Sequence, residues 1–179
     1  MELIKVNENF LNEIKGLVAQ AKQNAYTAIN LAMVEAYWNI GKRIVEEELN
    51  GKDRADYGKS IIKELSIALT AEFGKGFSKG SLYYYRQFYK TFPEIFATQW
   101  RILSWSHYKR LMQVPNEEAR MWYLREASEQ MWSLRTLSRN IESQYYNRLL
   151  LTQHKDRVVA EMKLKTEPYQ QDAYEFIKN

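Results

Sequence analysis

The chain has no proline between Asn7 and Asn50, and this feature most limits how it can fold. Proline disrupts the interior of a helix, so a proline-free stretch of this length with regularly spaced apolar residues favours an α-helix. The apolar residues recur at steps of three and four: Leu11, Ile14, Val18, Ala21, Ala25, Ala28 and Ala32. This pattern predicts a long N-terminal helix or a helical hairpin broken near Asn24–Thr27, and the sequence leaves both alternatives open.

The same apolar positions form a narrow stripe of the kind that joins two packed or supercoiled helices. Its second half consists of alanines, which allow the backbone of a partner helix to approach closely. We predict that the stripe is the seam of a homo-oligomer, and the residues expected to face the second chain are Leu11, Val18, Ala25 and Ala32. The alternative is that the stripe packs inside the core of the same chain.

The remainder of the chain also has helical patterns and lacks a useful run of β-strand alternation. The predicted helices cover 57–73, 78–92 and 104–112, one opens after Pro115, and one starts at Ser133. Only 7 Gly and 3 Pro occur in 179 residues, too few for the frequent turns of an all-β sandwich. The predicted fold class is therefore all-α, with a multi-helix domain over 1–153 and a charged linker or tail over 154–179.

Composition excludes several classes of protein. The chain contains no cysteine, which rules out disulfides, thiol nucleophiles and Cys-ligated metals. Its two histidines, His107 and His154, are far apart in sequence and have no carboxylates at ligand spacing, so neither a metal site nor a catalytic site is predicted. The longest uncharged stretch, 23–34, is too short to span a membrane, and the N-terminus lacks the pattern of a signal peptide. We therefore expect a cytoplasmic protein without membrane contact.

Two of the predicted helices, 57–73 and 78–92, are joined by Gly74-Lys75-Gly76-Phe77, which is the outline of a helix-turn-helix near 57–92. In this motif the second helix lies in the major groove of DNA, and its first residues contact the base edges. One face of the second helix is expected to pack on the preceding helix; it carries Leu82, Tyr85, Tyr89 and Phe92. A plain helical hairpin in a bundle is the alternative interpretation.

Positive charge is concentrated between Lys75 and Arg110, where seven basic residues and one acidic residue, Glu94, give a net charge of +6. Such a window attracts the phosphates of a nucleic acid. Polar and aromatic side chains beside the cations can read bases or bond phosphates. His107 is expected either to join two helices or to contact a phosphate. The predicted nucleic-acid-binding residues are Lys75, Lys79, Ser81, Tyr84, Arg86, Gln87, Lys90, His107, Lys109 and Arg110.

Several short motifs, taken in order, resemble the N-terminal domain of the YhcG family over about residues 10–150. They are Tyr37-Trp38-Asn39-Ile40-Gly41, Tyr57-Gly58 through Leu65-Ser66, Gly76-Phe77-Ser78, Arg86-Gln87-Phe88-Tyr89, Leu103-Ser104-Trp105-Ser106-His107-Tyr108, and Trp132-Ser133-Leu134-Arg135 with Leu137. A second similarity is to the helix-turn-helix core of ParB-type partition proteins. In that core a turn precedes a recognition helix, and a Leu-Ser-x-x-His segment comes later. The same order is present here in Gly74–Phe92, Pro93 and Leu103–His107.

The resemblance to the YhcG family implies a DNA-binding domain that precedes a C-terminal PD-(D/E)xK nuclease domain in bacterial proteins. Such nucleases hold Mg²⁺ with two carboxylates on adjacent strands, next to a lysine. Glu161-Met162-Lys163 spells part of this motif, but no strand pattern surrounds it, so we predict no catalytic residue and no cofactor in this chain. Residues 172–179 resemble the approach to the nuclease domain, and Mg²⁺ is expected only in that domain.

The favoured hypothesis is therefore a domain that binds duplex or branched DNA, delivers a nuclease to it and is not catalytic by itself. The expected partners are DNA, a second copy of the chain and the C-terminal nuclease domain of the parent protein. The alternative is a helical oligomerisation or protein-docking module of the same nuclease.

Overall fold

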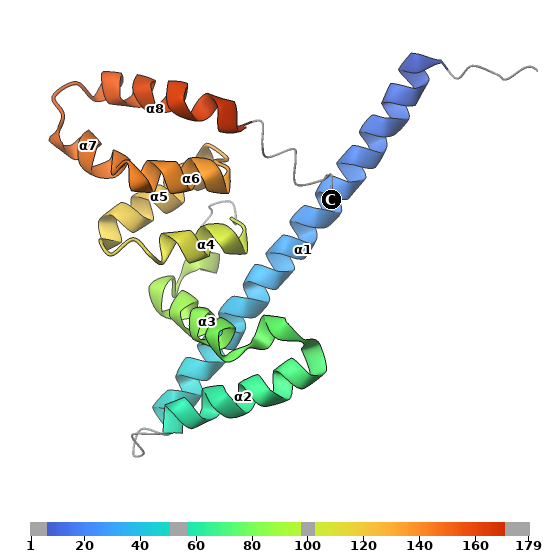
Figure 1. The fold of residues 1–179 in the computed structure, drawn as a ribbon, viewed down its shortest axis with the longest axis vertical. Coiled ribbons are helices and arrows are strands. Elements are labelled where there is room, and N and C mark those ends of the chain that lie inside the picture. Colours follow the sequence, from blue (N-terminus) through green and yellow to red (C-terminus); the bar gives the residue numbers. More distant parts are fainter. Residues whose placement is uncertain (1–6, 51–56, 98–102, 171–179) are drawn as a thin grey trace, which may run out of the picture.

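The computed structural model describes residues 7–50, 57–97 and 103–170, and all regular elements in these ranges are helices. The predicted all-α class is confirmed. The first helix, α1 (Glu8–Asn50), runs for 43 residues without a break, which excludes the alternative of a hairpin near Asn24–Thr27. Figure 1 shows α1 as a long rod, with α2 and α3 at its C-terminal half and the later helices stacked beyond α3.

Side-chain caps mark the starts of three helices after α1. The side chain of Ser78 accepts a hydrogen bond from the backbone N–H of Ser81, and Asn116 and Ser133 cap the helices that begin at Glu117 and Leu134 in the same way. Ser104, predicted to cap the helix over 104–112, makes no such bond. The elements are α2 (Tyr57–Phe73), the 3-10 turn η1 (Lys75–Phe77), α3 (Lys79–Thr91), the 3-10 turn η2 (Ile95–Ala97), α4 (Trp105–Leu111), α5 (Glu117–Glu129), α6 (Leu134–Glu142), α7 (Tyr145–Leu151) and α8 (Lys155–Gln170).

The third helix contacts the preceding helix α2 as we predicted, but it packs mainly against α1. The ring of Tyr85 stacks on Tyr37 with centroids 4.2 Å apart, and Tyr89 meets Trp38 edge to face at 5.1 Å. The indole N–H of Trp38 also donates to the carbonyl of Phe92 at 2.8 Å. The predicted buried face of α3 is therefore correct for Leu82, Tyr85 and Phe92, but its main partner is the long helix.

Gly41 makes this close crossing of α1 and α3 sterically feasible. A Cβ at this position would lie 2.0 Å from the carbonyl oxygen of Tyr85, a distance that no side chain tolerates. The crossing divides the buried residues into two clusters. The smaller one is formed where α1, α2 and α3 meet, by Ile44, Ile62, Leu82 and Tyr85. The larger one extends from Val34 of α1 through α3 to α8.

The C-terminal part differs from the prediction in two places. The helix predicted from Ser133 is broken at Gln144, whose backbone is left-handed with φ 52°. The break lets the backbone N–H of Tyr146 donate to the hydroxyl of Tyr123 at 3.0 Å, so that α7 begins in a new direction. Within the predicted tail, residues 155–170 form helix α8, which packs on α6 and α7 through buried Met162 and Thr166. Residues 171–179 lie outside the described residues.

Among the described residues, no helix has the length and apolar content needed to cross a membrane.

Candidate nucleic-acid interface

A cleft between the start of α3 and helix α4 brings together residues that lie about 25 positions apart in sequence. It has a volume of about 310 Å³ and is lined by Ser78, Gly80, Ser81, Tyr84, Trp105 and Lys109. We call it the α3–α4 cleft. Three of the predicted binding residues line it, namely Ser81, Tyr84 and Lys109. The fold therefore joins both parts of the basic window at one place.

The chemistry of the α3–α4 cleft suits an anion. Lys109 contributes an ammonium group to the wall, and Lys79, between the lining residues Ser78 and Gly80, is exposed. Neither lysine has a carboxylate within salt-bridge distance among the described residues. The first turn of α3 also carries backbone N–H groups at the positive end of a helix of 13 residues. Ser78 and Ser81 add two hydroxyls, 3.0 Å apart.

Trp105 forms the base of the cleft and is held by other aromatic rings. Its ring centroid lies 5.1 Å from that of Tyr37 and 5.4 Å from those of Tyr85 and Phe88. Our predicted set omitted Ser78, Gly80 and Trp105. The capping role of Ser78 was a usable signal for that residue, whereas nothing local in the sequence shows that α4 lies against the start of α3.

Arg86 is placed differently from the other predicted residues of α3. Its Nε donates to Oε2 of Glu48 on α1 at 2.8 Å, and both side chains are more than two-thirds buried. The two residues are 38 positions apart, so no local pattern in the sequence indicates the pair. Arg86 thus links α3 to α1, and its charge is largely neutralised there.

His107 joins two helices, which was one of the two roles expected for it. Its Nε2 lies 3.0 Å from the carbonyl oxygen of Trp132, which only accepts, so Nε2 carries the proton. Its Nδ1 then accepts from the hydroxyl of Ser104 at 2.6 Å. Burial lowers the pKa of His107 from its ordinary value. A neutral imidazole that is fully hydrogen-bonded has no proton left for a phosphate.

The remaining predicted residues are spread around the cleft. Arg110 bonds Gln113 at 2.8 Å and forms an ion pair with Glu142 of α6 at 3.0 Å. Gln87 is exposed on α3 and donates to Thr91 at 3.2 Å. Lys75 is exposed on η1 and Lys90 is exposed in the last turn of α3. Of the ten predicted residues, the structure therefore brings three into the cleft, leaves Lys79 next to it and commits three others to contacts within the fold.

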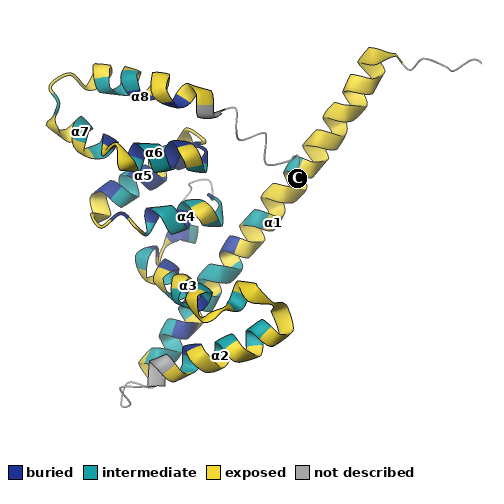
Figure 2. Ribbon diagram, in the orientation of Figure 1, coloured by how far each residue is buried: buried dark blue, intermediate teal, exposed yellow. Residues whose placement is uncertain are grey.

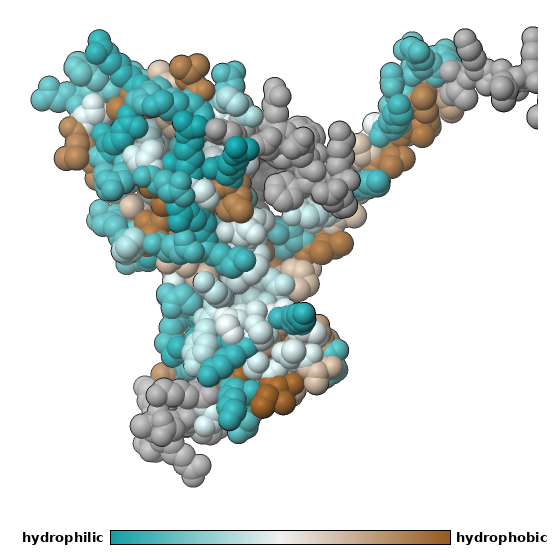
Figure 3. All heavy atoms as spheres, viewed as in Figure 1, coloured by the Kyte–Doolittle hydropathy of each residue, from teal (hydrophilic) through white to brown (hydrophobic). Residues whose placement is uncertain are grey.

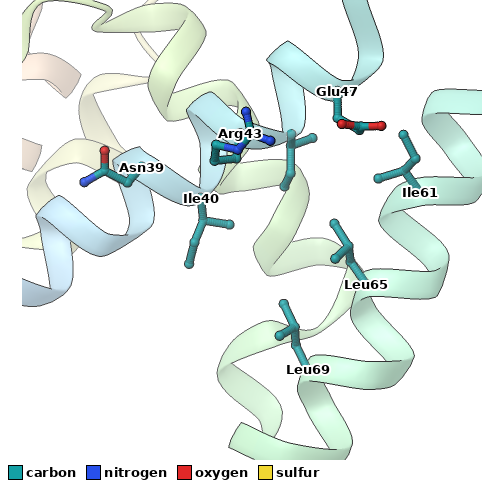
Figure 4. A pocket seen from close by; sticks show the side chains of 8 residues that line it. Asn39, Ile40, Arg43, Glu47, Ile61, Leu65 and Leu69 are labelled. Carbon is teal, nitrogen blue, oxygen red and sulfur yellow. The ribbon is translucent and has the colours of Figure 1, made fainter. Parts of the chain in front are cut away.

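A second hollow, between α1 and α2, has a different character. Figure 4 shows Ile40 of α1 and Ile61, Leu65 and Leu69 of α2 pointing into the space between the two helices. Its volume is about 440 Å³; five of its eight lining residues are apolar, and the other three are Asn39, Arg43 and Glu47. Arg43 forms an ion pair with Glu46, and Glu47 adds a negative charge, so the α3–α4 cleft is the better candidate for a nucleic acid.

The predicted seam lies on a part of α1 that the rest of the chain leaves bare. Between residues 8 and 29, which we call the arm, every residue is exposed except the half-buried Gln23 (Figure 2). All four predicted seam residues, Leu11, Val18, Ala25 and Ala32, are exposed. Hydrophobic surface follows the arm in Figure 3. None of the four belongs to the core that the described residues of this chain form.

The described residues offer no group of three or more His, Asp and Glu side chains that could hold a metal ion. The tripeptide Glu161-Met162-Lys163 lies in helix α8, where Glu161 forms ion pairs with Arg148 and Lys165 and Met162 is buried. It therefore lacks the strand on which a PD-(D/E)xK site places its carboxylate and lysine.

Comparison with known proteins agrees with the extent of this helical unit. Residues 13–148 match the DUF1016 N-terminal domain family. The chain is also 33% identical over 174 residues to an Escherichia coli (strain K12) protein named "Putative nuclease YhcG", a match that covers 80% of this chain and 46% of that protein. The chain thus spans about half the length of this relative. No solved structure matches it. Because the family match covers most of the chain and includes α3, α4 and the intervening cleft, the chain belongs to the DUF1016 N-terminal domain family, the N-terminal domain of YhcG-type proteins.

Proposed function

We propose that this domain binds DNA through the α3–α4 cleft and delivers the nuclease domain of its parent protein to that DNA. The observation that carries the proposal is the convergence, at one cleft, of the first turn of α3 with Lys109 of α4. Helix α3 is the proposed recognition helix, and α2, η1 and α3 form the proposed helix-turn-helix. The net charge of +6 between Lys75 and Arg110 supports an anionic partner.

Each cleft residue has a definite role in this proposal. Lys79 and Lys109 attract and bond phosphates, and the N–H groups of the first turn of α3 bond the same anion. Tyr84 is 46% exposed and offers both a ring face for stacking and a hydroxyl for hydrogen bonding. Ser81 and Gln87 are the side chains on this face that can read base edges. Arg86 contributes to the positive field of α3 but is held by Glu48.

We place the catalytic step outside this chain. The relative that is named a nuclease is about twice as long as the region matched here. The proposal assigns Mg²⁺ binding and phosphodiester cleavage to the part of the parent protein beyond this domain, and it assigns targeting to the domain itself.

The experiment is a fluorescence-anisotropy titration of the chain against duplex, branched and single-stranded DNA at two salt concentrations. Binding through several phosphate contacts weakens with salt, with a slope of about −0.9 in log K against log salt for each phosphate neutralised on a duplex. We expect a preference for duplex or branched DNA over a single strand. Weak binding without salt dependence for every DNA form contradicts the proposal.

Substitutions in the cleft locate the contact. Lys79→Ala and Lys109→Ala are each expected to weaken binding by roughly 1–3 kcal/mol if they touch the DNA directly. The matched control is Lys163→Ala, which removes an exposed lysine from α8, a helix that does not contact α3. If both cleft variants bind as tightly as the control, α3 is not the reading helix.

We further propose that the domain forms a homo-oligomer, since the exposed seam on the arm supports this second candidate function. The two functions are compatible, because helix-turn-helix proteins commonly bind DNA as dimers.

A further inference from the structure

We propose that two copies of this chain pair through their arms in antiparallel orientation. Leu11 then lies opposite Ala28 of the partner subunit, Ile14 opposite Ala25 of the partner subunit, and Val18 opposite Ala21 of the partner subunit. This inference rests on the oligomerisation proposed above and adds its direction and register. The occupant of the exposed seam is a second copy of the same helix.

The first argument is the uneven size of the seam residues. The N-terminal half of the seam carries Leu11, Ile14 and Val18, whereas the C-terminal half carries only alanines. A parallel pair would place large side chains against large ones at one end and alanine against alanine at the other. The spacing between the helices would then have to change along the seam. From residue 11 to residue 28, an antiparallel pair places a large side chain opposite an alanine in every layer, so two straight helices pack at constant separation. Ala32 then lies at the end of the pairing, opposite residue 7 of the second chain.

The second argument is that the head does not obstruct the seam. The head is the part of the chain from Ile40 onward that surrounds the C-terminal half of α1. Successive helical residues are rotated by about 100°. The α1 residues that pack on α3 are Tyr37, Trp38 and Gly41. By this rotation they lie about 180° around the helix from the mean direction of the seam. A partner helix on the seam therefore approaches from the side of α1 that faces away from its own α3.

The third argument is length. In the proposed register residue 8 of one arm lies opposite residue 31 of the other, so the pairing uses about 24 residues of each helix. The first contact of α1 with the head along the chain is that of Asn30, whose side chain donates to the carbonyl of Leu103 at 3.4 Å. The paired segment thus coincides with the segment that the head leaves uncovered (Figure 1).

The fourth argument is the amount of apolar surface. Six side chains on and beside the seam are 42–68% exposed: Phe10, Leu11, Ile14, Leu17, Val18 and Leu31. At roughly 150–200 Å² for each fully exposed side chain, they present on the order of 500 Å² per chain before the alanines are added. This approaches the roughly 800 Å² per partner of a standard stable interface. A patch of this size is in the range of the largest apolar patches on monomeric proteins, which are often functional.

The charges beside the seam provide a signature of the orientation. Lys15 and Lys22 flank the seam on one side, and in the antiparallel register this flank meets the same flank of the second chain. Each lysine then lies within two residues, about 3 Å along the axis, of the level of the other lysine in the second chain. In a parallel pair the same lysines face apolar positions instead. The proposed dimer therefore contains two exposed like-charge contacts, which salt weakens. Salt should tighten this dimer, whereas salt weakens the binding of DNA.

The geometry has a consequence for the DNA-binding proposal. The two crossings of α1 with α3, at Gly41 of each chain, lie 43 residues apart along the paired helices, which is about 65 Å at 1.5 Å per residue. Two turns of B-DNA span about 68–72 Å. Measured along the paired helices, the two crossings, which are related by a two-fold axis, are therefore spaced close to two turns of B-DNA.

The first test is sedimentation velocity on the 179-residue chain, for which we expect a dimer. Ala25→Glu places a charge in the seam and should give a monomer whose circular dichroism retains the helical signal of the head. Thr27→Glu places the same charge on the opposite face of the exposed arm, so this control should remain dimeric. A parent chain that sediments as a monomer overturns oligomerisation and this inference together.

The second test separates the direction of pairing from pairing itself. The chain has no cysteine, so introduced cysteines are the only sites for a short thiol cross-linker. A mixture of Leu11→Cys and Ala28→Cys chains should cross-link, and Leu11→Cys alone should not, because its two copies lie about 25 Å apart along the axis. Lys22→Glu should tighten the dimer about fivefold, the effect of two exposed ion pairs. Efficient cross-linking of Leu11→Cys alone, or no tightening by Lys22→Glu, overturns the antiparallel register while oligomerisation stands.

Discussion

The two halves of α1 have similar numbers of apolar residues but opposite environments. In the C-terminal half, Val34 and Ile44 are buried and Tyr37 and Trp38 pack against rings of α3. In the arm, apolar residues such as Leu17 and Ile29 remain more than 60% exposed. Helix propensity alone does not hold such a long bare helix in water, since most helical stability in proteins comes from packing of an apolar face. The covered half therefore stabilises the fold, whereas the bare half would be stabilised by a partner that buries its apolar side chains.

The largest expected effect comes from removing a ring at the crossing of α1 and α3. Tyr85→Ala removes the ring that stacks on Tyr37 and the hydroxyl that donates to the carbonyl of Gly76 at 2.8 Å. We expect a loss of about 3–5 kcal/mol in the free energy of unfolding, measured by urea titration. Tyr26→Ala on the arm is the matched control and should change it by less than about 0.5 kcal/mol, because Tyr26 is half exposed. Equal losses of unfolding free energy in Tyr85→Ala and Tyr26→Ala would contradict the conclusion that only the C-terminal half of α1 is packed against the rest of the chain.

Replacement of glycine by alanine should lower the stability of the fold in the C-terminal half of α1 and raise it in the arm. Gly41→Ala drives a Cβ to within 2.0 Å of the Tyr85 carbonyl oxygen and should cost about 1–3 kcal/mol of stability. At Gly16 on the arm no atom lies within 4 Å of the added Cβ, so Gly16→Ala should stabilise the helix by about 0.5–1 kcal/mol. Thermal unfolding followed by circular dichroism measures both. A stabilising Gly41→Ala would contradict the close crossing.

Features encoded by neighbouring residues were predictable from the sequence, and features that depend on distant contacts were not. The bounds of α2 and the Ser78 cap of α3 follow from a helical pattern, a glycine and a serine within a few residues. The choice of α1 as the partner of α3 depends on Gly41, whose role appears only when Tyr85 lies against it. The break at Gln144 was missed because a non-glycine residue takes the left-handed conformation there, and tertiary contacts override the local preference.

The candidate site shows the same division. Ser81 and Tyr84 were predicted from their spacing on α3, and both line the cleft together with Lys109. Arg86 was predicted as a cation on the flank of the same helix, but its partner Glu48 lies in another helix, and burial of the pair depends on how α1 and α3 cross. Helical periodicity shows which face a residue occupies; it does not show what lies opposite that face.

Alanine substitutions of Arg86 and Lys79, which lie on the same helix, should differ by a smaller amount in their effect on the unfolding free energy. Arg86→Ala leaves the partly buried carboxylate of Glu48 without its partner, so we expect a loss of about 1 kcal/mol in unfolding free energy. Lys79→Ala removes an exposed side chain and should leave stability within about 0.5 kcal/mol of the parent. A double-mutant cycle of Arg86→Ala with Glu48→Ala measures the coupling directly. Zero coupling would show that the ion pair does not hold α3 to α1.

The smallest expected effect is a pH dependence that arises at the contact of α4 with α6. Burial lowers the pKa of His107 in the folded protein, whereas the unfolded chain titrates near the ordinary value of about 6.5. The unfolded state therefore binds the proton first as the solution is acidified. The stabilising contribution of neutral His107 is complete above about pH 6.5 and is lost as the pH falls from there through the lower native pKa.

This pH effect can be assigned to His107 by comparison with a side chain that does not titrate. One proton changes the unfolding free energy by at most about 1.4 kcal/mol per pH unit, so the parent should lose no more than this from His107 per unit below pH 6.5. His107→Gln should be less stable at neutral pH, because Ser104 and Trp132 lose part of their hydrogen bonding, but its stability should decline less between pH 7 and 5. Glu126, whose pKa burial raises, and Glu161, whose pKa is lowered by the hydrogen bonds from Lys165 and Arg148, titrate equally in both proteins. Their contributions cancel in the difference between the two proteins. If the curves of unfolding free energy against pH were parallel for the parent and His107→Gln over this range, the pKa of His107 would be the same in the folded and unfolded protein.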